Sequence, residues 1–371
     1  MTVLLSVLAF VVLLTVLVLI HEFGHFLAAR SAGVIVEEFG FGLPPRAKTL
    51  FRRGTTIFTL NWIPFGGFVR LKGDNVLTLG ESRAQGSFGS VSIGKRIIIL
   101  IAGVLMNLAL ALVLLTIGFS FGRWIPTYFT LEDMQQAADK GIIHLSLGVL
   151  ITDVESGAGA AKVGVPPKSL LTAVDGVPVT TPEDVPALQE DKWRVTYTVL
   201  TGEKWDVEEE YKVVLDEGKA GIALVLFPRE LSAPPHDFLL SVQLALRETW
   251  AVSRQTISGI GQLFRSLAQT GTVPEGITGF VGIAQLTYTS VQAGFMTYLR
   301  LVALLSLSLA VLNILPFPAL DGGRLIFVLV EFIGRRPVNR RFELITNALG
   351  FVFLIGLLLF ITFYDVIRLF R

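Results

Sequence analysis

Four long apolar stretches dominate the pattern of hydrophobic and polar positions along the chain. Charged residues are absent from all four, which are Met1–Ile20, Ile97–Gly122, Leu301–Leu320 and Leu344–Tyr364. Each is close to the roughly 20 residues that cross a hydrocarbon core as a helix. The first stretch also lacks the basic start and small-residue cleavage pattern of a secretory signal. The pattern predicts a polytopic α-helical membrane protein with about four transmembrane helices.

A shorter alternation of apolar and polar residues follows the first stretch. Two alternating runs, Thr55–Ile63 and Phe68–Lys72, are joined by the sequence Pro64-Phe65-Gly66-Gly67. Alternation bounded by Pro and Gly predicts a β-hairpin. Its apolar side chains suit either a hairpin that dips into the bilayer surface or a small soluble hairpin, and the pattern favours neither.

Short β-like runs continue between Leu147 and Leu226, with a turn signal at Asp175-Gly176. They predict a compact, mostly β domain of about 80–90 residues, near the usual domain size. The period then changes, because apolar residues recur every three or four positions from Phe238 to Leu267. This spacing predicts an amphipathic helix, which either lies on the membrane surface or packs against the β domain. Gly276–Tyr298 is uncharged as well and leaves open an extra partial span.

Composition strengthens the membrane assignment. The 371 residues are 52% hydrophobic and 16% charged, whereas soluble domains carry roughly 25% charged residues. A net charge of +1 indicates no general attraction to nucleic acid, and the absence of cysteine excludes disulfides, thiolate zinc sites and cysteine nucleophiles.

Charge between the apolar stretches predicts their orientation. Residues 26–96 hold ten Lys/Arg against four Asp/Glu, whereas residues 123–295 hold 13 against 21. Five arginines follow the third stretch, at positions 324, 335, 336, 340 and 341. By the positive-inside rule the hairpin and the third connection are cytoplasmic. The acidic middle region with its β domain is then exported.

A metal-binding pattern closes the first apolar stretch, in the sequence His21-Glu22-Phe23-Gly24-His25. Positions i and i+4 share one face of a helix, so both imidazoles can bind one Zn²⁺ and Glu22 can act as general base. Ionisable groups at membrane depth are costly and mark functional sites. A polar helix end at the interface is the alternative interpretation.

A catalytic zinc needs a third protein ligand, and Asp321 is the candidate. It ends the third apolar stretch in the sequence Asn313-Ile314-Leu315-Pro316-Phe317-Pro318-Ala319-Leu320-Asp321-Gly322-Gly323. Two prolines and two glycines prevent a regular helix here, and the predicted topology places Asp321 at the depth of His21. Asp321 as a simple helix cap is the alternative. The other histidines, His144 and His236, fall in the exported region.

This combination of motifs resembles the site-2 proteases, which are intramembrane zinc metalloproteases. The β domain is similar to a PDZ domain, which places the chain near the bacterial RseP-like branch with one PDZ domain. Gly148–Val154 resembles the peptide-binding first strand of such a domain, and Ala173–Val179 its central hairpin. The sequences Phe39-Gly40-Phe41-Gly42, Gly66–Gly73 and Ala102–Asn107 also match the family pattern.

The resemblance implies His21, His25 and Asp321 as zinc ligands and Glu22 as the catalytic base. It implies that Asn313 supports the oxyanion or the substrate. The hairpin, with the segment Gly66, Gly67, Phe68, Val69 and Arg70, would be a membrane-associated β-loop that binds substrate. Three positions depart from the family pattern: Val104, Phe280 and the pair Lys168-Ser169. The last weakens the expectation of a standard peptide-binding mode.

The resemblance further implies an endopeptidase that cuts transmembrane segments of single-span proteins, such as anti-sigma factors or signal-peptide remnants. It implies a multi-pass protein of the cytoplasmic (inner) membrane, with the active site near the cytoplasmic side and peptide tails as partners of the PDZ-like domain. The expected parts are 1–122 and 301–371 for the two halves of the membrane core, 123–230 for the exported region with the PDZ-like domain at about 145–228, and 231–300 for the amphipathic helix and connecting segment.

Three other functions compete with this one. A zinc-binding scaffold would dock peptides without turnover, but a structural site needs no general base. A membrane-anchored protease with a soluble catalytic domain would carry its zinc motif outside an apolar stretch. A metal transporter would need more intramembrane carboxylates and histidines than the chain offers.

Overall fold

The computed structural model describes residues 2–74, 80, 84–202 and 205–370. The chain forms two compact units. Residues 1–122 and 235–371 form the first, called the membrane unit here, and residues 123–234 form the second, called the sheet unit.

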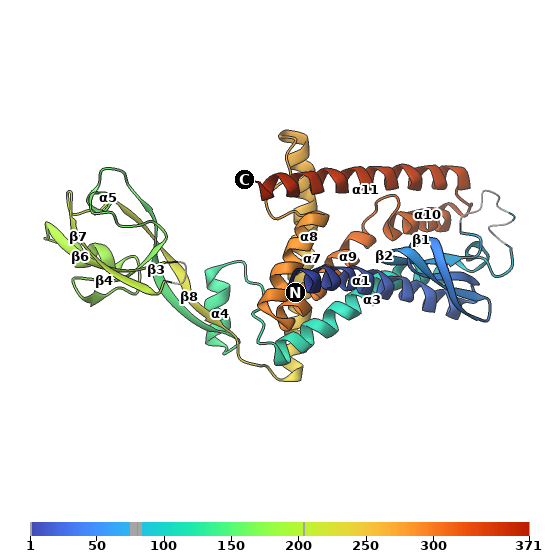
Figure 1. Ribbon diagram of the computed structural model, residues 1–371, viewed down its shortest axis with the longest axis horizontal. Coiled ribbons are helices and arrows are strands. Elements are labelled where there is room, and N and C mark those ends of the chain that lie inside the picture. The colour runs from blue at the N-terminus through green and yellow to red at the C-terminus, as the bar shows by residue number, and fades with distance from the viewer. Residues whose placement is uncertain (1, 75–79, 81–83, 203–204, 371) are drawn as a thin grey trace. The chain divides into compact units, whose positions relative to one another are not determined.

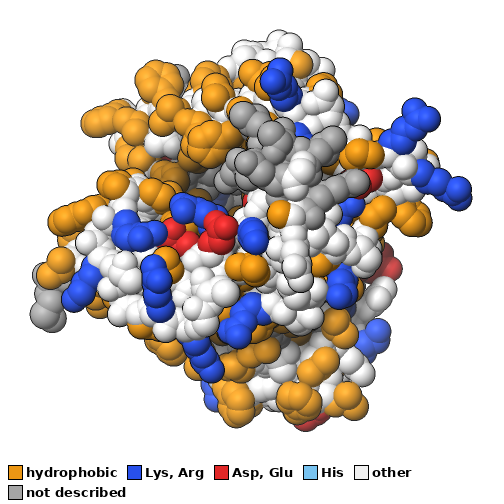
Figure 2. Space-filling view, turned by 90° about the vertical axis from the view of Figure 1, so that its right-hand side faces the viewer, with side chains coloured by type: hydrophobic (Ala, Val, Ile, Leu, Met, Phe, Trp, Pro, Cys, Tyr) orange, Lys and Arg blue, Asp and Glu red, His pale blue; other side chains and the backbone are white. Residues whose placement is uncertain are grey.

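Among the described residues of the membrane unit, four helices are long and apolar enough to cross a bilayer, as the sequence predicts. They are α1 (Thr2–Ala32), α3 (Ile93–Phe121), α9 (Phe295–Ile314) and α11 (Arg340–Leu369). The C-terminal end of α1 and the N-terminal ends of α3 and α11 lie at the end of the unit that carries the hairpin (Figure 1). Figure 2 looks onto this end and shows many Lys and Arg side chains with few Asp and Glu.

The third span is shifted from its predicted position. Helix α9 ends at Ile314, six residues before the end of the predicted stretch, and α10 (Asp321–Gly334) begins after a bend. Pro316 and Pro318 lack the N–H groups that a continuing helix needs. Ala319 has a positive φ of 75°, which closes the bend. The apolar stretch therefore consists of a helix and a turn that delivers Asp321.

The predicted amphipathic helix is α7 (Phe238–Gln269). Its apolar stripe is exposed, with Leu239, Leu246 and Trp250 at 67%, 54% and 74%. Another face, which includes Leu244 and Ala245, is buried within the membrane unit, where α7 contacts α3 and α9.

The uncharged segment Gly276–Tyr298, for which the sequence left open an extra partial span, contains α8 (Phe280–Ala293). Its 14 residues extend about 21 Å, too short to cross a bilayer. The carboxylate of Asp365 from α11 accepts hydrogen bonds from the N–H groups of Gly279 and Gly282, at 2.7 and 2.9 Å. The side chain of Asp365 therefore caps the first turn of this short helix.

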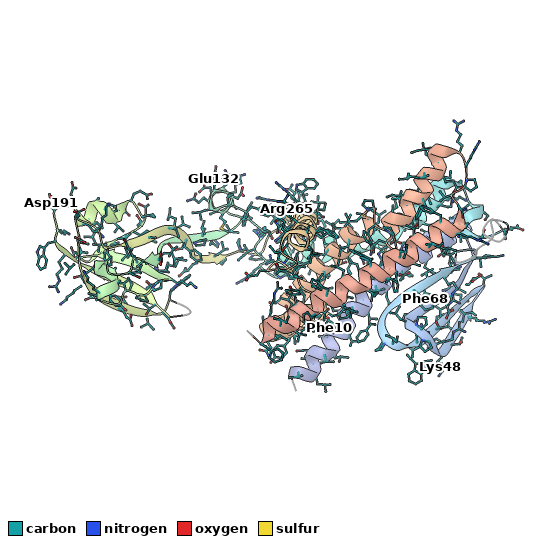
Figure 3. All side chains as sticks on the ribbon, turned by 90° about the horizontal axis from the view of Figure 1, so that it is seen from above. Phe10, Lys48, Phe68, Glu132, Asp191 and Arg265 are labelled. Atoms are coloured by element: carbon teal, nitrogen blue, oxygen red, sulfur yellow. The ribbon has the colours of Figure 1, made fainter. Side chains whose placement is uncertain are left out.

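The hairpin differs from its prediction. The two alternating runs, expected to pair with each other, lie along one strand, β2 (Thr56–Leu71), whose partner is β1 (Val36–Arg53). Residues 38–41 of β1 pair with 67–70 and also with 57–60. The first half of β1 therefore lies between the two halves of β2, which leaves 67–71 as an edge. Figure 3 shows Phe68 and Lys48 on this hairpin.

The sheet unit holds α4 (Leu131–Asp139), α5 (Gly159–Lys162), α6 (Asp184–Gln189) and six strands. These are β3 (His144–Val154), β4 (Ser169–Val174), β5 (Val177–Pro178), β6 (Arg194–Thr201), β7 (Val207–Val214) and β8 (Ile222–Ser232). Five strands follow the order β7-β6-β4-β3-β8, and β5 pairs with β4 as the predicted hairpin around Asp175-Gly176. Its core includes Val149, Leu171 and Tyr197, and the buried side chain of Gln189 donates a hydrogen bond to the tyrosine hydroxyl.

The resemblance placed a peptide-binding strand at Gly148–Val154, and the sheet order contradicts this. Residues 149–151 of β3 pair with β4 on one side and with β8 on the other. At these three central positions the strand has no free backbone groups for a peptide, and the rest of the segment pairs with β8. The edge next to it is β8.

Candidate metal centre

The first helix brings its two histidines together as the i, i+4 spacing predicts. The Nε2 atoms of His21 and His25 lie 3.1 Å apart, and both residues are buried. Asp321, the first residue of α10, points its Oδ2 at both rings, 2.9 Å from His21 Nε2 and 3.2 Å from His25 Nε2. One ligand atom from each of the three residues falls within 4.8 Å of the others.

Glycines that follow Asp321 allow this approach. A Cβ on Gly322 would collide with the carbonyl oxygens of Ile314 and Leu315, and one on Gly323 with that of Phe317. The turn therefore folds so tightly against α10 that only glycine fits. Local backbone packing, together with the two prolines, fixes the position of the Asp321 carboxylate.

The donor set suits zinc. Two imidazole nitrogens and one carboxylate oxygen are the ligands of many catalytic zinc sites, where the fourth position stays open to water and substrate. His25 Nδ1 lies 2.8 Å from the carbonyl oxygen of Ile99, so Nδ1 carries the proton and Nε2 keeps its lone pair. No other group of three His, Cys, Asp or Glu residues in the described part of the chain converges in this way.

Two residues of α3, Asn107 and Gly103, lie against the two histidines, and the sequence analysis assigned neither of them a role. Asn107, fully buried, has its Nδ2 3.4 Å from His21 Nδ1, and its Oδ1 has no hydrogen-bond partner among the described atoms. Turning the amide by half a rotation lets Oδ1 accept from Nδ1–H and keeps Nε2 of His21 free. Ser306 of α9 donates to the backbone carbonyl of Asn107 at 2.8 Å and holds this turn of α3.

Gly103 packs directly against the two imidazole rings. A Cβ at this position would collide with His25 Nε2 and with the ring of His21. The imidazoles thus fill the space that a side chain would occupy. The sequence signal for these two positions was the match of Ala102–Asn107 to the family pattern, which assigned no role to either residue.

Glu22 lies between the histidines and the hairpin. Its Oε2 accepts a hydrogen bond from the backbone N–H of Val69 at 3.0 Å. Val69 lies on the 67–71 edge, so this N–H points away from β1. The general base predicted from the sequence therefore adjoins both the cluster of three ligand atoms and an unpaired strand edge.

The other members of the predicted β-loop lie against α1. Gly66 is close to Val18, and a Cβ on Gly67 would collide with Leu19 and with the carbonyl oxygen of Gly40. Thr15 of α1 donates to the Pro64 carbonyl at 3.1 Å. The bend in β2 thus follows α1 back from the level of Glu22 toward the middle of that helix.

Charged groups hold the same hairpin in shape. Arg70 forms an ion pair with the buried Glu38 at 3.1 Å and lies over the ring of Phe68. Arg46 binds the other oxygen of Glu38 at 2.7 Å. Two guanidinium groups therefore compensate the one carboxylate that is buried in the hairpin.

The side chain of Asn313 forms no hydrogen bond with the described residues of the metal cluster. It is half-buried in the last turn of α9 and has no hydrogen-bond partner among the described residues. Its predicted role in binding the oxyanion or the substrate stays a prediction.

Comparison with known proteins gives one consistent picture. The model of the family named Peptidase family M50 matches residues 9–357. A Campylobacter jejuni protein named "Putative zinc metalloprotease Cj1068" is 29% identical over 98% of this chain and 93% of its own length. Zinc metalloprotease RasP of Geobacillus kaustophilus is 25% identical over 98% of both chains. The chain therefore belongs to peptidase family M50, the site-2 proteases, and is a zinc-dependent metalloprotease of the membrane.

Proposed function

We propose that this protein hydrolyses peptide bonds in the transmembrane segments of single-span membrane proteins, with His21, His25 and Asp321 as zinc ligands and Glu22 as general base. One observation carries the proposal. Three ligand atoms from two helices converge within 4.8 Å, and the adjoining Glu22 is hydrogen-bonded to the Val69 strand edge.

Zinc, when bound, polarises the scissile carbonyl and makes water a stronger acid. Glu22 then accepts the proton of the attacking water and returns it to the leaving amine. The Val69 N–H holds the Glu22 carboxylate toward the site before this transfer. Asn313 would donate to the developing oxyanion or to the substrate backbone.

The strand edge at Gly67–Leu71 explains how a helical substrate can be cut. A peptide bond inside a helix is shielded by its own hydrogen bonds, so the segment must unwind. An unwound segment can pair with an exposed edge by β-augmentation. Because Val69 belongs to this edge, a paired substrate would lie next to Glu22.

Sidedness follows from charge. The Lys/Arg-rich end with the hairpin would face the cytoplasm of a bacterial inner membrane, and the sheet unit would be exported. The sheet unit would be a PDZ-like domain that restricts access or binds peptide tails. The exposed apolar stripe of α7 would lie on the outer membrane surface.

A cleavage assay tests the proposal. Purified wild-type enzyme, incubated in detergent with a single-span model substrate, should cut within or beside the transmembrane segment. A chelator should stop cleavage and added zinc should restore it. Glu22→Gln should retain zinc but lose turnover, because the amide cannot accept the proton. Turnover by Glu22→Gln would remove Glu22 from the base role, and cleavage only outside the membrane segment would contradict intramembrane proteolysis.

A further inference from the structure

The sheet unit ends on one side in a strand that has a single partner. In the described part of the chain, β8 pairs with β3 alone. Beside the start of β8 lies a groove of about 1180 Å³. Its walls are formed by residues 221–224 at the start of β8, by α6 and the residue Pro182 before it, and by the Asp216–Lys219 turn. A free strand edge that borders a long groove has the geometry of β-augmentation, in which an added strand gains backbone hydrogen bonds.

The groove is strongly acidic. Its lining holds six carboxylates and one cation, Lys219. The carboxylates belong to Asp153, Glu155, Glu190, Asp191, Asp216 and Glu217, all with exposed side chains. None of the six forms an ion pair among the described residues. Figure 3 labels Asp191, which lies at one end of the sheet unit.

This charge distribution selects the occupant. A C-terminal carboxylate in the groove would lie among the six carboxylates of its lining, and like charges across an interface cost binding energy. Lys or Arg side chains would meet opposite charge along both walls. The β8 side of the groove also offers apolar side chains, Ala223 and Leu224.

We propose that this groove binds an extended, Lys/Arg-rich segment of a protein chain, which adds as a strand to β8, and that it rejects free C-terminal carboxylates. The inference rests on the proposed function only in taking that segment to belong to a protease substrate. Binding itself uses no residue of the metal centre. The groove would thus favour substrates that carry a basic stretch on the side of the membrane where the sheet unit lies.

Peptide binding to the full-length chain tests this. The Glu22→Gln variant, reconstituted in nanodiscs, is titrated against three fluorescent ten-residue peptides of one β-prone sequence. One carries lysines at alternate positions and an amidated C-terminus, one carries glutamates there with the same amide, and one is neutral with a free carboxylate. The lysine peptide should bind at least about tenfold more tightly than either of the others, and salt should weaken it.

Matched charge reversals locate the site. Asp216→Lys with Glu217→Lys should weaken the lysine peptide on the order of tenfold. Glu208→Lys with Glu210→Lys changes the net charge equally, but on β7, away from the groove, and should leave binding nearly unchanged. Ala187→Trp, which fills the groove from α6, should weaken all three peptides.

Equal binding of the amidated lysine and glutamate peptides would overturn the proposal. Tighter binding of the neutral peptide with the free carboxylate than of the lysine peptide would overturn it as well. Equal losses from the two double reversals would show only a general charge effect and would overturn it too. A chelator should not alter peptide binding. A failure of the proposed protease function would instead appear in the wild-type cleavage assay, so the two outcomes are distinguishable.

Discussion

The two units of the molecule place polar and apolar side chains in opposite ways. In the membrane unit many apolar side chains face outward, such as Leu4 at 76% and Phe121 at 75% exposed, while the polar His21, His25 and Asn107 are buried. In the sheet unit the interior is an apolar core around Val149, Leu171 and Tyr197, and the carboxylates lie on the rim.

This difference shows what each interior does. Apolar burial drives folding in water, so the core of the sheet unit contributes stability. Lipid is as apolar as leucine, so burial of this kind gives little between membrane helices. Polar groups inside the membrane unit are costly there, and three of them, His21, His25 and Asn107, meet in one cluster with a chemical use. Mutations inside the membrane unit should therefore impair zinc binding, whereas mutations inside the sheet unit should lower its folding stability.

The largest effect is expected at the third ligand. Asp321→Ala should lose most bound zinc, and cleavage should fall by more than about a hundredfold, because even outer partners of metal ligands contribute 10–100-fold. Zinc stoichiometry by mass spectrometry measures this. Asp139→Ala, an exposed carboxylate on α4 of the sheet unit, is the control and should keep full zinc. Equal zinc contents in the two variants would mean that another residue completes the site.

A single methyl group should disturb the site from α3. Gly103→Ala places a Cβ against both imidazoles, so zinc affinity should fall about 10–100-fold. Gly94→Ala on the same helix meets no atom within 4 Å and should bind zinc like the wild type. Competition with a chromophoric chelator gives both affinities. If Gly103→Ala binds zinc normally, α3 does not pack against the imidazoles as described.

A core truncation in the sheet unit should lower its stability and leave zinc binding unchanged, in contrast to the two variants of the metal centre. Leu171→Ala removes a side chain that is 1% exposed, and such truncations cost about 2–5 kcal/mol. Hydrogen exchange should increase across β3, β4 and β6, while zinc content and affinity stay unchanged. Loss of zinc in this variant would show that the two interiors are not independent.

The smallest expected effect is a loss of local stability in the sheet unit at low pH. The Asp184 carboxylate accepts hydrogen bonds from the backbone N–H groups of Thr180 and Thr181 and from the Thr180 hydroxyl, which lower its pKa from 3.8 to about 2. Because the folded state holds the charged form, this stabilisation is complete above pH 3.8 and disappears as the pH falls toward 2. The protection factors around α6, which correct hydrogen exchange for the pH dependence of its intrinsic rate, should therefore fall below about pH 4. Asp184→Asn should flatten that dependence, and a profile identical to the wild type would contradict it.

Features that depend on spacing within one segment could be predicted from the sequence. The two histidines share a face of α1 because of their i, i+4 spacing, and the four spans follow from uncharged length. The prolines indicated the broken stretch before Asp321, but the helix boundary at Ile314 was missed because the turn is as apolar as the helix.

Contacts between segments could not be predicted in the same way. Gly103 and Asn107 lie in a largely apolar helix, and only the packing of α3 on α1 shows that they contact the imidazoles. The two alternating runs of the hairpin suggested mutual pairing, yet both lie on β2, because β1 lies between its halves. The strand order that exposes β8 instead of β3 is likewise a property of the whole sheet.

X-ray absorption at the zinc edge tests the central claim most directly. For the zinc-loaded wild type we expect two imidazole nitrogens at about 2.0–2.1 Å with oxygen ligands in the remaining positions. His25→Ala should reduce the imidazole count to one, or lose the metal. A zinc shell without two imidazoles in the wild type, or one that His25→Ala leaves unchanged, would contradict the account.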